Sequence, residues 1–197
     1  MNFSLKKLVD DHINLAYLLV LAERRLEHSE TPEQLTNALP FLCACMDYLC
    51  DYPQQIHHPL ENKLIEFMVN KHSYMSRFLP ILKKDHEQLE ATTQQLRIKL
   101  HAANDQLNTT MLLANKESLL QCLRLQLQHL SDEENQLLPL VETLMTPQDW
   151  QVFNQQLKQQ AAFDKIKSKQ ESFATKLHQL VSLGRNGGLA SEAWQSL

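Results

Sequence analysis

The sequence has few glycines, and this shortage limits the fold. Its 197 residues include only three glycines, at positions 184, 187 and 188. Hairpin turns need glycine more than any other residue does, so the chain has little material for a β-sheet. The leucine, glutamine, glutamate, lysine and alanine that dominate the composition favour helices instead. We therefore predict an all-α protein.

Basic runs and long apolar runs are also missing. The formal net charge is −4 and no long basic segment occurs, so nucleic acid is not an expected partner. No apolar stretch approaches the roughly 20 residues that a membrane span needs. The segment 1–12 contains Asp10 and Asp11 in place of an apolar signal core. We expect a cytoplasmic protein that binds neither nucleic acid nor a membrane.

The cysteines do not form a recognisable framework. Cys43, Cys45 and Cys50 fall within one predicted helix, where close spacing hinders mutual disulfides, and Cys122 lies far away. The pair Cys43-x-Cys45 does not have the spacing of a zinc site. We interpret the thiols as reduced, buried side chains, with a redox or metal role as the alternative.

Apolar residues recur at alternating steps of three and four, the pattern of one helix face. The pattern predicts long helices, with a break or kink at Tyr52-Pro53 and a distortion before Pro139. The expected ranges are 4–28, 32–51, a continuation to 70, 76–103 and 110–144. Helices of this length with short connections predict an up-down-up-down four-helix bundle over residues 1–145.

A C-terminal helical extension over residues 146–197 should follow the bundle. Thr146-Pro147 is typical of a capped helix start. A second amphipathic stretch surrounds Phe173, Leu177 and Leu180. We expect the tail after Gly184 to be loose.

Three histidines are followed four residues later by glutamate: His57 by Glu61, His86 by Glu90 and His129 by Glu133. In a helix this spacing puts both side chains on one face, where they can hold the same ion. His12 and His86 also occupy positions where the apolar stripe predicts leucine. A single buried histidine is usually a core residue with a satisfied hydrogen bond, so the argument requires the set.

The candidate ligands lie at a similar depth along the axis of the predicted bundle. In an antiparallel bundle, the starts of helices 4–28 and 76–103 share one side with the ends at 70 and 144. Counted from that side at 1.5 Å per residue, the candidates all lie roughly 12–22 Å deep. They are His12, His57, Glu61, His86, Glu90, His129 and Glu133. Such groups are costly to bury unpaired, and metal coordination removes that cost.

The types of donor atom narrow the choice of metal ion. Imidazole and carboxylate without thiolate suit iron or manganese better than structural zinc, and seven ligands fit two ions that share carboxylates. The ferritin-like alternative builds its site from Glu-x-x-His pairs, and this chain contains none.

These motifs resemble the hemerythrin-like, or HHE, cation-binding family. The resemblance covers roughly residues 4–145 and rests on His12, the run His57-His58-Pro59-Leu60-Glu61, Asp85-His86-Glu87, and the run from His129 to Glu134. It implies two iron ions bridged by an oxo or hydroxo group and by two carboxylates. The histidines at 12, 57, 86 and 129 would then be terminal ligands, and Glu61 and Glu133 the bridges.

The chain departs from the oxygen-carrying hemerythrins at two positions. Glu90 stands where they have a second histidine, and Glu134 stands where they bridge with aspartate. The departures disfavour reversible oxygen carriage. We expect Glu90 either to bind iron or to accept a hydrogen bond from a ligating histidine. His58 would lie behind the ligands or at the surface, and a helix starting at Pro59 would weaken the pairing of His57.

The resemblance implies a non-haem di-iron protein that binds or reacts with oxygen, peroxide or nitric oxide, and its partner would be that small molecule. An iron-dependent sensor or storage module without turnover is the first alternative. A metal-free helical interaction protein is the second.

Overall fold

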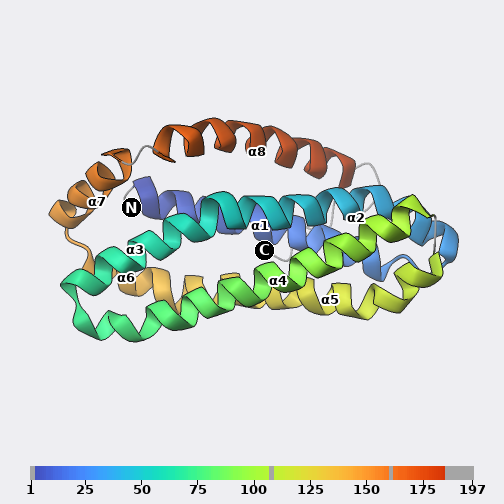
Figure 1. The fold of residues 1–197 in the computed structure, drawn as a ribbon, viewed down its shortest axis with the longest axis horizontal. Coiled ribbons are helices and arrows are strands. Elements are labelled where there is room, and N and C mark those ends of the chain that lie inside the picture. Colours follow the sequence, from blue (N-terminus) through green and yellow to red (C-terminus); the bar gives the residue numbers. More distant parts are fainter. Residues whose placement is uncertain (1–2, 107–108, 160–161, 185–197) are drawn as a thin grey trace.

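The computed structural model describes residues 3–106, 109–159 and 162–184 (Figure 1). Every regular element in these ranges is helical and none is a strand, which confirms the predicted all-α class. Within the same ranges, no helix combines the length and apolar character that a membrane span requires.

The elements follow one another with short connections. In chain order they are α1 (Phe3–Glu27), α2 (Pro32–Tyr52), η1 (Pro53–His57), α3 (His58–Lys71), η2 (Ser73–Arg77), α4 (Phe78–Asp105), α5 (Thr109–Asp132), η3 (Glu133–Leu137), α6 (Leu138–Leu144), α7 (Pro147–Gln159) and α8 (Ala162–Gly184). The elements η1 and η3 are π-helical turns, and η2 is a 3₁₀ helix.

The start of α2 follows from its sequence. The Thr31 side chain accepts a hydrogen bond from the Gln34 backbone N–H, and the Gln34 side chain accepts one from the Thr31 N–H. This reciprocal capping box satisfies two backbone donors that the helix leaves unpaired. Pro32 occupies the first turn, where its missing N–H costs nothing.

The break or kink predicted at Tyr52-Pro53 takes the form of a distorted helical turn, and the helix is not interrupted. The chain stays helical there, and both residues have right-handed helical backbone angles. One wider π-helical turn replaces the break, so α2, η1 and α3 form one continuous rod. The distortion predicted before Pro139 is confirmed, because η3 separates α5 from α6.

The described elements build four helical rods: α1, α2–η1–α3, α4 and α5–η3–α6. Consecutive rods run in opposite directions (Figure 1). The first rod packs against α2 and α5, and α4 packs against α2, α3 and α5. The helix α8 lies along α1 and α2 on the outside of the rods (Figure 1).

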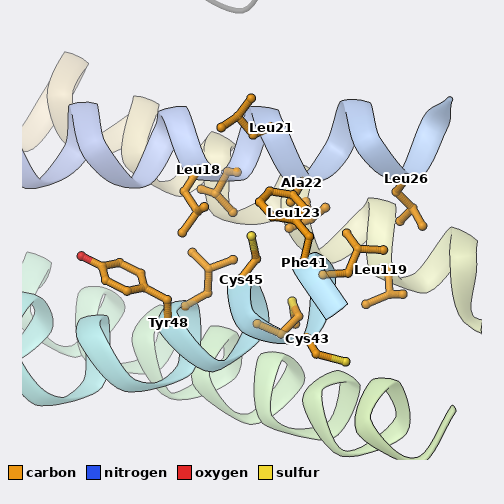
Figure 2. Close-up of a cluster of buried hydrophobic side chains, with 14 of the residues drawn as sticks. Leu18, Leu21, Ala22, Leu26, Phe41, Cys43, Cys45, Tyr48, Leu119 and Leu123 are labelled. Carbon is orange, nitrogen blue, oxygen red and sulfur yellow. The ribbon is translucent and has the colours of Figure 1, made fainter. Parts of the chain in front are cut away.

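Two apolar clusters fill the space between the rods. In the larger, Leu18 and Leu26 of α1 pack with Phe41 of α2 and with Leu119 and Leu123 of α5 (Figure 2). The smaller lies toward the other end of the rods and contains residues of α1, α3, α4, α6 and α7. A layer of buried histidine and glutamate separates the clusters: His12, for example, falls between Leu8 of the smaller and Leu15 of the larger.

The predicted C-terminal apolar stretch belongs to the same core. Phe173 and Leu180 of α8 are buried in the larger cluster. At Gly184 a Cβ atom would lie 3.1 Å from Leu21 and 3.2 Å from Phe41, so glycine permits close approach of the helix end. The division at residue 145 stays a prediction, and the tail from 185 to 197 lies outside the described residues.

All four cysteines are buried free thiols, as the sequence interpretation expected. Burial raises the pKa of Cys43 to about 11 and that of Cys50 to about 12. Because the thiolate is the reactive form, these side chains act at neutral pH as small apolar groups.

Candidate metal centre

Two π-helical turns position the centre, and each precedes a proline. The turn η1 ends at His57, two residues before Pro59, and η3 begins at Glu133 and ends two residues before Pro139. A proline ring clashes with the carbonyl four residues earlier in a regular helix, and the wider turn relieves that clash. Each π-helical turn therefore carries one predicted ligand.

The π-helical turn also decides whether His57 belongs to the helix. A helix that started at Pro59 would leave His57 outside it. Instead His57 has right-handed helical angles, and its Nε2 lies 3.9 Å from Glu61 Oε2. The one-turn spacing of this pair is kept.

Six of the seven predicted ligands lie in the polar layer between the two apolar clusters. They come from all four rods. Their exposed fractions are 1% for His12, 0% for His57 and Glu61, 3% for His86, 4% for Glu133 and, for the side chain, 11% for His129. The seventh, Glu90, is partly exposed at its edge.

Glu133 faces a different histidine with each carboxylate oxygen. Its Oε2 lies 3.4 Å from His12 Nε2. Its Oε1 lies 3.1 Å from His129 Nε2 and 3.4 Å from His86 Nε2. The carboxylate therefore spans the space between a histidine of α1 and two histidines of α4 and α5.

Glu61 makes a second connection across the layer. Its Oε2 lies 3.9 Å from His57 Nε2 and 3.4 Å from His86 Nε2. The Nε2 atoms of His12 and His57 are 3.1 Å apart. One histidine pair, His12 with His57, thus faces another, His86 with His129, and the two carboxylates lie between the pairs.

Donor atoms in this layer form two clusters that could each hold a metal ion. In each cluster, one ligand atom per residue lies within 4.8 Å of all the others. The first contains His12, His57, Glu61 and Glu133, and the second contains His58, His86 and His129. These are nitrogen and oxygen donors without sulfur, the set that iron, manganese and similar divalent ions accept.

Several buried donor atoms of the layer lack hydrogen-bond partners among the described residues. They are His12 Nδ1, His57 Nδ1, both oxygens of Glu61, His86 Nδ1, His129 Nε2 and Glu133 Oε2. A buried polar atom without a partner costs about 1–3 kcal/mol. Cations between the histidine pairs would engage the Glu61 oxygens, His129 Nε2 and Glu133 Oε2, so these residues fit a metal centre.

The two central carboxylates differ in their proton affinity. Burial and the charge of Glu61 raise the pKa of Glu133 well above its usual range. Burial also opposes ionisation of Glu61, but hydrogen bonding to His86 and the charge of His57 lower its pKa below the usual range. The layer thus favours one negative charge over two when no cation is present.

Two of the predicted histidine ligands, His12 and His129, are held in the neutral form that binds metal. Burial, reinforced by the charge of neighbouring histidines, lowers the pKa of His12 to about 4 and that of His129 to about 3. The pKa of His57 changes in the opposite direction. Burial works against its protonation, but Asp11 and Glu61 raise its pKa.

Asp11 supports His57 from outside the layer. Its Oδ2 lies 3.7 Å from His57 Nδ1. Tyr52 donates a hydrogen bond of 2.6 Å to Asp11 Oδ1, and the Lys7 ammonium donates to both Asp11 oxygens and to the Tyr52 hydroxyl. A carboxylate beside the outer nitrogen of a metal-binding histidine orients the ring.

Glu90 and His58 form a pair at the edge of the layer. His58 Nδ1 lies 2.7 Å from Glu90 Oε1, and the His58 ring stacks on that of His86 with centroids 3.8 Å apart. The sequence predicts that Glu90 either binds iron or accepts a hydrogen bond from a ligating histidine, and the observed contact is with a histidine outside the predicted ligand set. Its partner is His58, which is buried in the layer and does not lie at the surface.

Comparison with protein-family models, curated proteins and solved structures gave no match for this chain. The resemblance to the hemerythrin-like family therefore stays a prediction from the sequence motifs.

Sequence reasoning missed the contributions of Asp11, Lys7 and Tyr52. One signal was present, because Lys7 and Asp11 have the spacing of a helical ion pair and Asp11 precedes His12. No local pattern connects Tyr52 with Asp11, since 41 residues separate them and the contact depends on how α2 packs against α1.

Proposed function

We propose that this chain is a hemerythrin-like four-helix bundle that holds two iron ions and binds or reacts with dioxygen, peroxide or nitric oxide. The observation that carries the proposal is the placement of Glu133. Each of its oxygens faces a different histidine pair, an arrangement suited to a carboxylate shared by two ions. One ion alone would leave one of the pairs without a partner.

The arrangement of the rods supports the bundle. Four antiparallel rods, each packed against two neighbours, correspond to the up-down-up-down topology of the family. The ligands come from all four rods at one depth, as in other bundles that build a metal site in the core.

Each protein group has a role in this proposal. His12 and His57 would hold one ion and His86 and His129 the other, with Glu61 and Glu133 shared. Bound iron would supply redox equivalents and exchangeable coordination positions. The two apolar clusters exclude bulk water from both sides of the layer.

Reaction with a small molecule is favoured over reversible oxygen carriage. The oxygen-carrying hemerythrins have a histidine where this chain has Glu90. Glu90 cannot supply an imidazole, and its carboxylate is engaged with His58.

Metal analysis of protein loaded with Fe²⁺ without oxygen tests the proposal. We expect about two iron ions per chain and, after exposure to air, near-ultraviolet and visible absorption from a coupled ferric pair. Saturation at one ion, or no binding, would refute the di-iron assignment.

An iron sensor without turnover is the second candidate, and one observation favours it. The unpaired donors in the polar layer make the metal-free protein costly to keep folded, so iron would control the stability of the fold. Peroxide added to the ferrous protein separates the two candidates. Repeated consumption of peroxide supports the reactive protein, and a single stoichiometric oxidation supports the sensor.

A further inference from the structure

An open groove lies between α4 and the rod α5–η3–α6 and reaches the polar layer. Its volume is about 680 Å³, and its walls run from Phe78 to Thr92 on one side and from Cys122 to Leu137 on the other. His129 and Glu133 line it. It therefore connects solvent with two of the proposed iron ligands.

The ionisable side chains that line the groove are acidic, apart from His129. Three carboxylates line it, from Asp85, Asp132 and Glu133. Among the described residues whose side chains line the groove there is no lysine or arginine, because Lys83 and Lys84 of the same helix are not in its lining. Two other hollows are different, because one contains Lys6 and Lys7 and another contains Lys63 and Lys71.

The three carboxylates are arranged from the surface inward. Asp85 and Asp132 are exposed, whereas the Glu133 side chain is only 5% exposed. Glu133 Oε2 and His129 Nε2 are buried donor atoms without a hydrogen-bond partner among the described residues. An ion that enters the groove would therefore meet exposed charge first and unpaired ligand atoms next.

Within the part of the chain that the structure describes, the remaining proposed ligands are more enclosed. His12, His57, Glu61 and His86 are between 0% and 3% exposed. A small cavity of about 20 Å³ touches His57 and His129, which is room for no more than a water molecule. A hydrated divalent cation needs a wider path.

We propose that this groove is the entry route of ferrous iron, with Asp85 and Asp132 attracting the hydrated cation and passing it to Glu133 and His129. The inference rests on the proposed di-iron function and adds how the site is loaded. Carboxylates are the ligands that attract hard divalent cations, and a cleft lined by one sign of charge concentrates counter-ions. Once the ion reaches the layer, imidazole and carboxylate donors replace its water.

The rate of metal uptake tests the route separately from the site. The probe is Co²⁺, a redox-stable ion whose visible absorption reports binding to nitrogen and oxygen ligands, followed by stopped flow in the full-length protein. The groove variant combines Asp85→Asn and Asp132→Asn. The control combines Asp105→Asn and Glu117→Gln, which remove the same charge from the same two helices about 22–30 Å away.

We expect the groove variant to take up Co²⁺ about three- to tenfold more slowly than the parent at low salt, with the control close to the parent. All three should reach the same final absorbance. The difference should shrink at about 0.5 M salt, where exposed charges are screened. Asp85→Lys, which reverses a charge, should slow uptake more than Asp85→Asn.

Equal uptake rates for the groove variant and the control would overturn the route. A lower final absorbance in the groove variant would place the aspartates in the binding site itself and would also overturn it. A parent protein that takes up no Co²⁺ would refute the proposed function together with the inference.

Discussion

Glu133 and Glu134 are sequence neighbours in very different surroundings. Glu133 is almost fully buried between the two histidine pairs. The Glu134 side chain is 43% exposed, and its Oε1 lies 3.4 Å from the outer nitrogen of His12. Adjacent residues on a helix point in different directions, and here Glu133 is the one that lies between the histidine pairs.

This difference makes a sharp prediction for metal content. Glu133→Gln should bind at most about one iron ion per chain, because a neutral amide is a poor bridge between two cations. Glu134→Gln should keep about two. Anaerobic loading with Fe²⁺ followed by metal analysis measures both variants. The opposite ranking would transfer the bridging role to Glu134.

One residue, Asp149, connects the start of helix α7 to the end of α3. Asp149 caps the start of α7, accepting hydrogen bonds from the backbone N–H and hydroxyl of Thr146. It also accepts one from Lys71 at the end of α3. These contacts, with the bond to Lys71 contributing most, lower the pKa of Asp149 to about 2 from its usual 3.8.

The lowered pKa predicts a pH-dependent stability difference. A carboxyl group whose pKa is lower in the folded state stabilises the fold above its unfolded pKa, and this effect fades as the pH falls through the folded value. Asp149→Asn should therefore lower the free energy of unfolding near pH 6, with the deficit shrinking between about pH 4 and pH 2. Urea unfolding of metal-free protein across this range measures it.

Asp10→Asn is the matched control for this experiment, because it removes an exposed ion pair with Lys6 on α1. Exposed pairs of this kind contribute little to stability. A deficit for Asp149→Asn that stayed constant from pH 6 to pH 3 would show that capping alone, without the charge, accounts for the role of Asp149.

Across the whole molecule, the polar layer interrupts an otherwise apolar interior. Apolar clusters pack on both sides of it along the rods, so His12, His57, Glu61 and His86 are enclosed, and the groove beside His129 and Glu133 is the approach from solvent described above. A cation that binds only the folded state raises stability by mass action. The proposed iron would therefore stabilise the packing of the four rods at this layer, between the two apolar clusters.

Removing iron should accordingly lower Tm. With iron well above its dissociation constant, we expect a difference on the order of 5–15 °C for a chain of this size. Glu61→Ala with Glu133→Ala should abolish most of this iron effect while relieving the repulsion of the metal-free layer. Thermal melting of both proteins without oxygen, with and without Fe²⁺, measures it. Identical Tm values for the parent under the two conditions would contradict a metal-neutralised core.

Much of the site was accessible from the sequence, because helix periodicity is local. Six predicted ligands, among them His12, His86 and Glu133, lie together in the buried layer. Their shared depth followed from counting residues along antiparallel helices, which needs only the rise per residue and the direction of each helix. The starts of α2 and α7 followed from capping residues.

What the tertiary structure decided is everything that depends on how one rod is rotated and shifted against another. The π-helical turns before Pro59 and Pro139 rotate the residues that follow them about the helix axis. The sequence predicted a break or kink for the first of these turns and a distortion for the second. The contact of Glu90 with His58 and that of Tyr52 with Asp11 join residues 32 and 41 positions apart. Periodicity names the face of each helix, but the packing of many side chains sets the partner across the interface, and no local pattern carries that information.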